Sequence, residues 1–260
     1  MKIWVRTLAL TLALILTLTA APVMAAKKAT PTPAPREITT EVVEEVPETI
    51  QQLLDLAYNE WRELDGKKLK KSNKYTKWRN NYEWGWCAGF ITWCMLEMNI
   101  PQTVWTEIEE GEVEGLVHVK EAGVGKLVTG YTKMHRTTMT PQKGFILIYG
   151  KKGKNGLWHA GLVYDVEKLP NGKYRLTTLE GNVNSSVWMF VHDYDPNAEK
   201  KTKNISLVPE EERISVDANA FSYKYTYNDK DLYVNMFLMP WVPEEMAGEN
   251  APVPALTPAP

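Results

Sequence analysis

Apolar residues recur at helical spacing between residues 50 and 64. Seven of them share one face of a helix: Ile50, Leu53, Leu54, Ala57, Tyr58, Trp61 and Leu64. Positions spaced three and four apart line one side of an α-helix, so this pattern predicts an amphipathic helix packed on a core. Thr49 with Gln52 suits a capping box at its start, and Asp65-Gly66 favours its end.

A second helical pattern begins at Cys87. Its apolar face holds Cys87, Phe90, Ile91, Cys94, Met95 and Met98. Pro101 cannot continue a helix, so we expect the helix to stop near Asn99. Seven residues along a helix span roughly 10 Å, whereas a disulfide needs Cα atoms within about 7 Å. The two cysteines are therefore predicted to be free thiols.

From Pro141 the pattern changes to short runs typical of strands. We expect strands over 144–149, 158–166 and 173–179, with Asn171-Gly172 as a hairpin turn between the last two. A later run, 232–239, is expected to close or extend the sheet. Helices followed by consecutive strands predict an α+β domain, with N-terminal helices packed on an antiparallel β-sheet.

The two ends of the chain differ in composition from this domain. Residues 1–25 combine Lys2 and Arg6 with an apolar run and with small residues before a possible cleavage site, a pattern that predicts a secretory signal peptide. The alternative is an uncleaved membrane anchor. Residues 26–48 form a Pro/Thr-rich linker and 244–260 a disordered Pro/Ala-rich tail. One domain over 49–243 remains, and we expect it to work outside the cytoplasmic membrane without stable membrane insertion after signal cleavage.

Net charge and the spacing of the histidines bear on whether the protein binds nucleic acid or a metal ion. The formal net charge of −2 gives no argument for nucleic-acid binding. The four histidines form no close-spaced pair, so we expect no metal and no cofactor. Residues 67–79 are rich in lysine; they form a solvated loop or the rim of a cleft that meets an anionic polymer such as a cell wall. The sequence does not indicate an oligomeric state.

Cys87 is the strongest candidate for a catalytic nucleophile. At a helix N-terminus, unpaired amides and the helix dipole stabilise a thiolate, which lowers the cysteine pKa and raises its nucleophilicity. The alternative is a small buried hydrophobic residue, which suits Cys94 well. An exported domain that keeps two unpaired thiols needs a reason to do so, and catalysis is one.

Two segments of the predicted sheet could complete a reaction. His159 lies near the start of one strand, and Glu180 and Asn182 lie at the end of the next. Hairpin pairing brings these positions together. Either Glu180 or Asn182 could bond one ring nitrogen of His159 while the other nitrogen faces Cys87, the arrangement of nucleophile, base and orienting group in covalent acyl transfer. Strand burial for His159 and turn chemistry at Gly181 are the alternatives.

The segments 86–94 (WCAGFITWC), 159–163 (HAGLV) and 179–182 (LEGN), with the Pro141 to Gly144 strand entry, resemble the CHAP domain. CHAP domains are cysteine, histidine-dependent amidohydrolases/peptidases, related to NlpC/P60 and papain-like cysteine peptidases. The resemblance covers about 50–194, so 195–243 would be a C-terminal extension. It implies a papain-like fold and cleavage of peptidoglycan amide bonds. Phe145 departs from the family, which usually has aspartate there.

The resemblance also implies roles for single residues. Cys87 would be the nucleophile, His159 the general base and Glu180 its partner, with Asn182 close by.

We therefore expect a secreted, cysteine-dependent peptidoglycan hydrolase, an amidase or an endopeptidase, whose partner is peptidoglycan or its stem peptides. The backbone amide of Cys87 would stabilise the oxyanion. Trp84, Trp86 and Trp158 would line a substrate groove, with core packing as the alternative. Two other functions stay open: an inactive wall-binding module, and a cysteine peptidase acting on proteins.

Overall fold

The computed structural model of the chain describes residues 42, 45–80, 85–111, 113–152, 157–199, 202–209, 212 and 231–243. The predicted signal peptide, most of the linker and the predicted tail lie outside these residues. Within the described part, no helix combines the length and apolar character that crossing a membrane requires.

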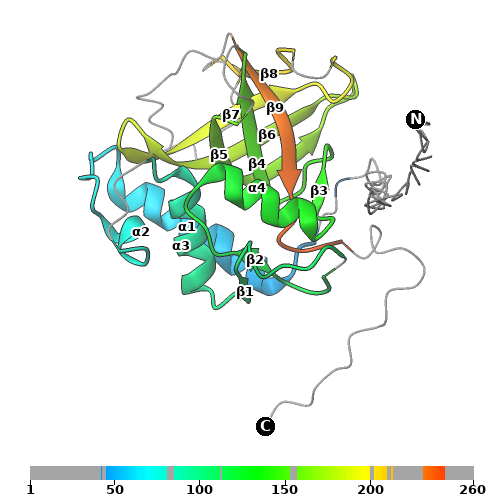
Figure 1. Cartoon of the computed structure of the whole chain (residues 1–260). Helices are drawn as coiled ribbons and strands as arrows, with labels where there is room; N and C mark the ends of the chain where they lie inside the picture. Colours follow the sequence, from blue (N-terminus) through cyan, green and yellow to red (C-terminus); the bar gives the residue numbers. More distant parts are fainter. Residues whose placement is uncertain are drawn as a thin grey trace, which may run out of the picture. The chain divides into compact units, whose positions relative to one another are not determined.

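Helices and strands both contribute to the described structure (Figure 1). The helices are α1 (Glu48–Leu64), α2 (Lys74–Lys77), α3 (Cys87–Glu97) and α4 (Val124–Lys133). The strands are β1 (Gln102–Thr103), β2 (His118–Val119), β3 (Thr137–Thr138), β4 (Ile146–Lys151), β5 (His159–Lys168), β6 (Tyr174–Val183), β7 (Ser186–Tyr194), β8 (Ile205–Leu207) and β9 (Leu232–Leu238). The predicted α+β class is confirmed.

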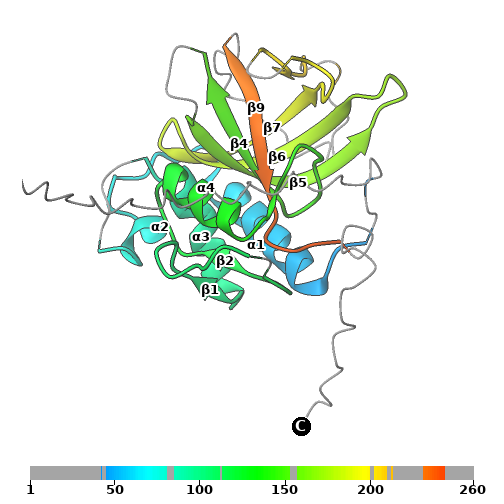
Figure 2. The same cartoon turned by 45° about the vertical axis from the view of Figure 1, so that its right-hand side comes forward.

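The main sheet is antiparallel and has the strand order β3-β9-β4-β5-β6-β7-β8. α1 and α3 pack against it at β5, β6 and β7, and both views show the helices together on one side (Figures 1 and 2). The sheet curls until its β8 edge meets β9, where the Val234 amide donates to Asn204 Oδ1 over 2.7 Å. This curl turns one face of the sheet inward, and that face can hold buried polar groups.

α1 follows the predicted apolar face closely. Ile50, Leu53, Leu54 and Ala57 are buried, and Asp65 ends the helix in the left-handed conformation, as the Asp65-Gly66 pair predicts. The predicted capping box is wrong. The N-cap is Pro47, which makes no side-chain cap hydrogen bond, and the helix therefore begins before Thr49.

α3 spans Cys87–Glu97, as predicted, but it is not a surface helix. Its first six residues, Cys87–Thr92, are buried on every side, whereas Trp93 and Leu96 are half-buried and Glu97 is exposed. A helical segment that is buried all round lies between other elements of a core. α3 has the sheet on one side, α1 and α2 on others and the strand β2 beyond, and so its N-terminus is held firmly.

The sheet is larger than the sequence pattern predicts. The strand expected to end at Leu179 runs on to Val183, so Glu180 and Asn182 lie inside β6 rather than after it. Strands β7 and β8 were not predicted, and neither was α4. The run 232–239 was expected either to close or to extend the sheet. It forms β9, within the predicted C-terminal extension, which lies between β3 and β4 and extends the sheet.

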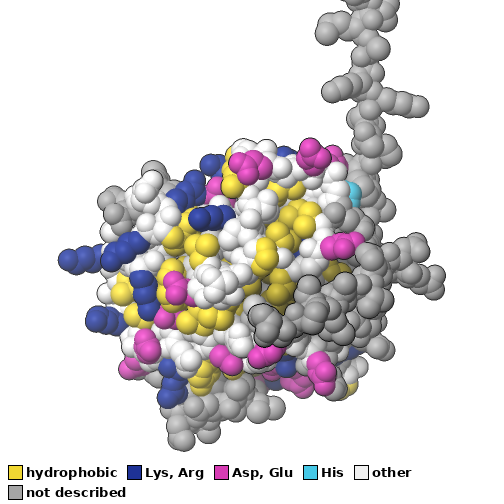
Figure 3. All heavy atoms as spheres, turned by 90° about the horizontal axis from the view of Figure 1, so that it is seen from below, with side chains coloured by type: hydrophobic (Ala, Val, Ile, Leu, Met, Phe, Trp, Pro, Cys, Tyr) yellow, Lys and Arg dark blue, Asp and Glu magenta, His cyan; other side chains and the backbone are white. Residues whose placement is uncertain are grey.

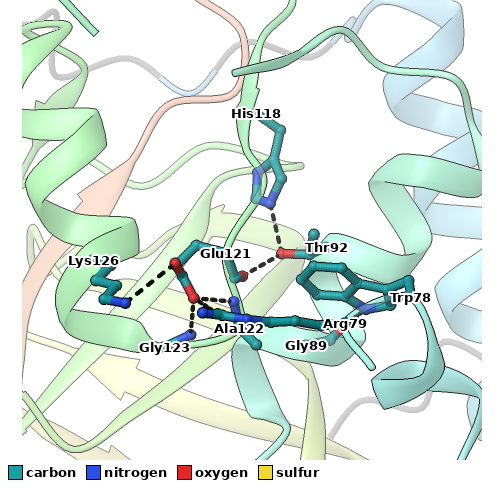
Figure 4. Close-up of polar contacts among 9 residues, drawn as sticks. All are labelled: Trp78, Arg79, Gly89, Thr92, His118, Glu121, Ala122, Gly123 and Lys126. Carbon is teal, nitrogen blue, oxygen red and sulfur yellow. Dashed lines mark hydrogen bonds and ion pairs between the residues drawn. The ribbon is translucent and has the colours of Figure 1, made fainter. Parts of the chain in front are cut away.

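A polar cluster fastens the segment around β2 to α3 (Figure 4). Thr92 donates to the Glu121 carbonyl over 2.7 Å and lies 2.9 Å from His118 Nε2; His118 Nδ1 is 2.9 Å from the Tyr131 hydroxyl. Glu121 pairs with Arg79 and accepts from the Ala122 and Gly123 amides. Burial lowers the pKa of His118 to about 3, so this histidine is a neutral structural residue.

Candidate active site

Cys87 is the first residue of α3, and its side chain is only 6% exposed. The thiol is hydrogen-bonded to the imidazole of His159, and the backbone amides of Ala160 and Ala88 also donate to the sulfur. Both cysteines are free thiols, as predicted. The structure therefore brings the helix start and the strand β5 together around one sulfur atom.

His159 is the first residue of β5, directly opposite Tyr149 of β4. Its Nε2 lies 3.0 Å from Glu180 Oε2. Because Nε2 is engaged with this carboxylate, Nδ1 is the ring nitrogen left for Cys87. The sequence left open whether Glu180 or Asn182 holds His159; in the described structure the hydrogen bond runs to Glu180.

Glu180 is completely buried and lies diagonally across the β5–β6 pair from His159. Gly161 makes this placement possible. A Cβ at Gly161 would stand 3.0 Å from Glu180 Cγ and 3.4 Å from its Oε1, closer than side chains normally pack. The glycine of the His159-Ala-Gly segment therefore leaves room for the carboxylate that supports the histidine.

The three groups shift one another's pKa values. Burial opposes the thiolate, but the charge and hydrogen bond of His159 outweigh it and lower the pKa of Cys87. Burial also opposes the imidazolium, yet Cys87 and Glu180 raise the pKa of His159 to about 10. Against the same burial, His159 and His192 hold the pKa of Glu180 well below its usual range. At neutral pH the arrangement favours a thiolate beside an imidazolium, backed by a carboxylate.

Asn182 lies at the other side of the helix start. Its backbone is left-handed, with φ 62°, and its Nδ2 is 3.3 Å from the position that a Cβ on Gly85 would take. Asparagine is one of the residues that tolerate this conformation. The amide therefore sits beside Gly85, in the segment that enters α3.

The three tryptophans predicted to line a groove have different surroundings. Trp86 is 1% exposed, stacks on Tyr75 with ring centroids 5.1 Å apart and packs over Gly181, so it lies in the core, the alternative the sequence allowed. Trp158 is 40% exposed, and its ring centroid is 5.4 Å from that of His159. Trp84 lies outside the described residues. Of the described pair, only Trp158 offers an open aromatic surface next to the reactive groups.

The lysine segment, residues 67–79, runs beside this end of α3. Leu69 donates its amide to the Ser185 carbonyl in the β6–β7 turn over 2.8 Å, and Trp78 Nε1 lies 3.4 Å from the Gly89 carbonyl. Lys74 pairs with Glu60 and Arg79 with Glu121. Five further lysines of the segment are exposed: Lys67, Lys68, Lys70, Lys71 and Lys77. Figure 3 shows Lys and Arg side chains gathered on the side where α2 lies in Figure 1.

No group of three His, Cys, Asp or Glu side chains suited to a metal ion occurs in the described part of the chain. The cluster around Cys87 has one sulfur, one imidazole and one carboxylate, but each is already hydrogen-bonded to its neighbour. A thiol, an imidazole and a carboxylate joined in this way are suited to proton transfer among themselves.

Sequence reasoning missed three residues that surround Glu180: Tyr149, Thr178 and His192. Tyr149 and Thr178 donate to Glu180 Oε1 over 2.5 Å and 2.7 Å, and His192 Nε2 is 3.4 Å from the same oxygen. They come from β4, β6 and β7 and share no motif. Thr178 lies two residues before Glu180 on the same face of β6, so strand alternation could have found it. Tyr149 and His192 come from other strands, and no spacing rule along the chain connects them with Glu180.

Comparison with known families agrees with this geometry. Residues 77–182 match the family model of the CHAP domain, as the sequence resemblance predicted. The matched stretch contains Cys87, His159, Glu180 and Asn182 and ends before β7. No curated protein and no solved structure matches the chain.

Proposed function

With a CHAP domain at residues 77–182 as the premise, we propose that this protein is a secreted, cysteine-dependent peptidoglycan hydrolase, an amidase or an endopeptidase. CHAP domains as a family are associated with hydrolysis of amide bonds, often those of peptidoglycan. The observation that carries the proposal is the chain of contacts from Cys87 through His159 to Glu180. We also propose that the fold is papain-like.

The proposed reaction uses these three groups in order. His159 holds the proton of Cys87, and the thiolate attacks the carbonyl carbon of the scissile amide. The tetrahedral intermediate collapses to a thioester as the imidazolium gives its proton to the leaving amine. Water then attacks the thioester with His159 as base, which releases the acid product and restores the thiol. Glu180 fixes the ring of His159 and balances the charge of the imidazolium throughout.

Residues around the sulfur would bind the substrate. The Cys87 backbone amide, at the positive end of α3, would donate to the oxyanion, and Asn182 lies beside the same chain entry. Trp158, exposed next to His159 with Lys151 5.1 Å from its ring centroid, offers a flat face to a sugar or a stem peptide. Peptidoglycan or its stem peptides would be the partner.

The direct test is Cys87→Ala with purified peptidoglycan. Because the sulfur forms the covalent intermediate, the variant should lose all measurable release of wall fragments while keeping the wild-type circular dichroism spectrum. Cys94→Ala is the matched control: Cys94 is buried on the same helix, away from His159, and its variant should keep activity. Mass spectrometry of the released fragments would identify the bond. Wild-type turnover by Cys87→Ala would end the proposal.

Two other functions can be separated from this one. An inactive wall-binding module would sediment with peptidoglycan but release nothing, and the lowering of the Cys87 pKa by His159 argues against it. A peptidase of secreted proteins would cleave casein in a zymogram and leave peptidoglycan intact. Export itself is tested by expressing the full chain and determining the N-terminus of the extracellular form; cleavage should fall after Ala25 or Ala26.

A further inference from the structure

The two oxygens of the Glu180 carboxylate have separate partners. Oε2 lies 3.0 Å from His159 Nε2. Oε1 accepts from the Tyr149 hydroxyl over 2.5 Å and from Thr178 Oγ1 over 2.7 Å. His192 Nε2 stands 3.1 Å from the Tyr149 oxygen and 3.4 Å from Glu180 Oε1. One oxygen therefore serves the histidine, while the other is held by a cradle of Tyr149, Thr178 and His192.

The cradle is built from three strands and is closed to solvent. Tyr149 and Thr178 are fully buried and His192 is 1% exposed. Strand register explains the meeting: Tyr149 stands opposite His159, and His192 stands opposite Leu176, four residues before Glu180 on the same face of β6. His192 lies beyond residues 77–182, the stretch that matches the family model.

We propose that Tyr149 and His192 are positioning residues for the reaction: they fix the Glu180 carboxylate so that its second oxygen faces the His159 ring. This inference rests on the proposed function and goes beyond it, because it assigns a role to two residues whose contacts are with the Glu180 carboxylate. A carboxylate accepting a single hydrogen bond could rotate about its χ3 torsion, whereas donors on both oxygens fix its plane.

The cradle also keeps Glu180 ionised. Glu180 is faced by Tyr149 from β4, His159 from β5, Thr178 from its own strand and His192 from β7, and Cys87 of α3 reaches it through His159. A buried carboxylate is costly without such donors. If donors to Oε1 are removed, Glu180 binds a proton at a higher pH, His159 loses its partner, and the Cys87 thiolate forms only at higher pH.

The experiment compares Tyr149→Phe, His192→Leu and His192→Gln with the wild type. Tyr149→Phe removes one oxygen and keeps the ring; Gln can return an N–H donor near the place of Nε2. Tyr131→Phe and His118→Leu are matched controls, since they break a second buried His–Tyr hydrogen bond of 2.9 Å that has no contact with Glu180. The readouts are kcat and KM on peptidoglycan, and the pH dependence of Cys87 alkylation by iodoacetamide, followed by peptide mass spectrometry.

Tyr149→Phe and His192→Leu should lower kcat about tenfold or more, because hydrogen bonds to a charged group are lost, and leave KM unchanged. The pH of half-maximal Cys87 alkylation should rise in both, and His192→Gln should recover much of the loss. The controls should melt earlier without moving the alkylation profile. The inference is overturned if the two cradle variants keep the wild-type kcat and alkylation profile, or if the controls move that profile equally. Alkylation needs no turnover, so it tests the cradle even if peptidoglycan proves not to be the substrate.

Discussion

Two cysteines on one helix illustrate how the surroundings of a residue decide its chemistry. Cys87 and Cys94 are both buried in α3 and both unpaired. Burial raises the pKa of Cys94 well above its ordinary value, and nearby Glu60 adds to the effect. At Cys87 the same burial is outweighed by His159, so its pKa falls. The difference depends on the imidazole, because burial by itself makes a thiol inert.

This contrast predicts selective alkylation. In the folded protein Cys87 should react with iodoacetamide well below pH 8.5, near which an ordinary thiol is half ionised, while Cys94 should stay unmodified until the protein unfolds. His159→Ala should move the reaction of Cys87 to higher pH, since the positive charge beside the sulfur is lost. Labelling followed by peptide mass spectrometry measures both residues at once. Equal reactivity of the two thiols in the native state would contradict the assignment of Cys87.

Among the elements, the contact between α3 and β6 sets the distance from the sulfur to the sheet. Gly181, between Glu180 and Asn182, lies directly under α3. A Cβ at this position would stand 2.5 Å from Phe90 Cβ and 3.1 Å from Trp86 Cζ3. The helix can approach the strand this closely only because position 181 has no side chain. The glycine therefore lets Cys87 and His159 reach each other.

Gly181→Ala should push α3 away from β6. We expect a loss of about 1–3 kcal/mol of stability from overpacking, and a fall in activity larger than that in folded protein, since Cys87 moves away from His159. Gly125→Ala is the control: nothing lies within 4 Å of a Cβ there, and alanine favours its helix α4. Thermal unfolding and wall hydrolysis measure both variants. If Gly181→Ala behaved like Gly125→Ala, the close approach would have no role.

The lysine segment next to α3 gives a second prediction for an element. If it meets an anionic wall polymer, replacing its five exposed lysines, Lys67, Lys68, Lys70, Lys71 and Lys77, with serine should weaken sedimentation with cell walls. The effect should shrink as salt is added, because screening weakens charge interactions between exposed groups. Replacing Lys168 and Lys173, at the β5–β6 turn, is the control. Equal losses for both sets would favour the other alternative, a solvated loop.

For the molecule as a whole, the curl of the sheet decides where charge can be buried. β4, β5, β6 and β7 each send a polar side chain to the same enclosed place, where Glu180 is kept as a carboxylate. Its pKa is held well below the usual range in the folded state. A carboxyl group with a lowered folded pKa contributes stability above its unfolded pKa and loses that contribution as the pH falls.

This linkage predicts the acid stability of the protein. The contribution of Glu180 should be complete above pH ~4.3, the usual pKa of glutamate, and should decline steadily as the pH is lowered further. Glu180→Gln should be less stable than the wild type at pH 7 and should show a flatter fall of melting temperature between pH ~4.3 and pH ~2. Glu114→Gln changes an exposed carboxyl and serves as the control. Parallel melting curves for wild type and Glu180→Gln across this range would refute the linkage.

The sequence by itself determined the parts of this protein whose cause is local. Periodicity placed α1 and α3, Asn171-Gly172 placed a hairpin, and the segments around Cys87, His159 and Glu180 were enough to indicate the CHAP domain. Local spacing, however, says nothing of partners several strands away. Only the tertiary structure decided that Glu180 holds His159, that Trp86 lies in the core and that Tyr149 and His192 meet the same carboxylate. Those contacts depend on strand register and on the curl of the whole sheet, which are set by packing among elements far apart in the chain.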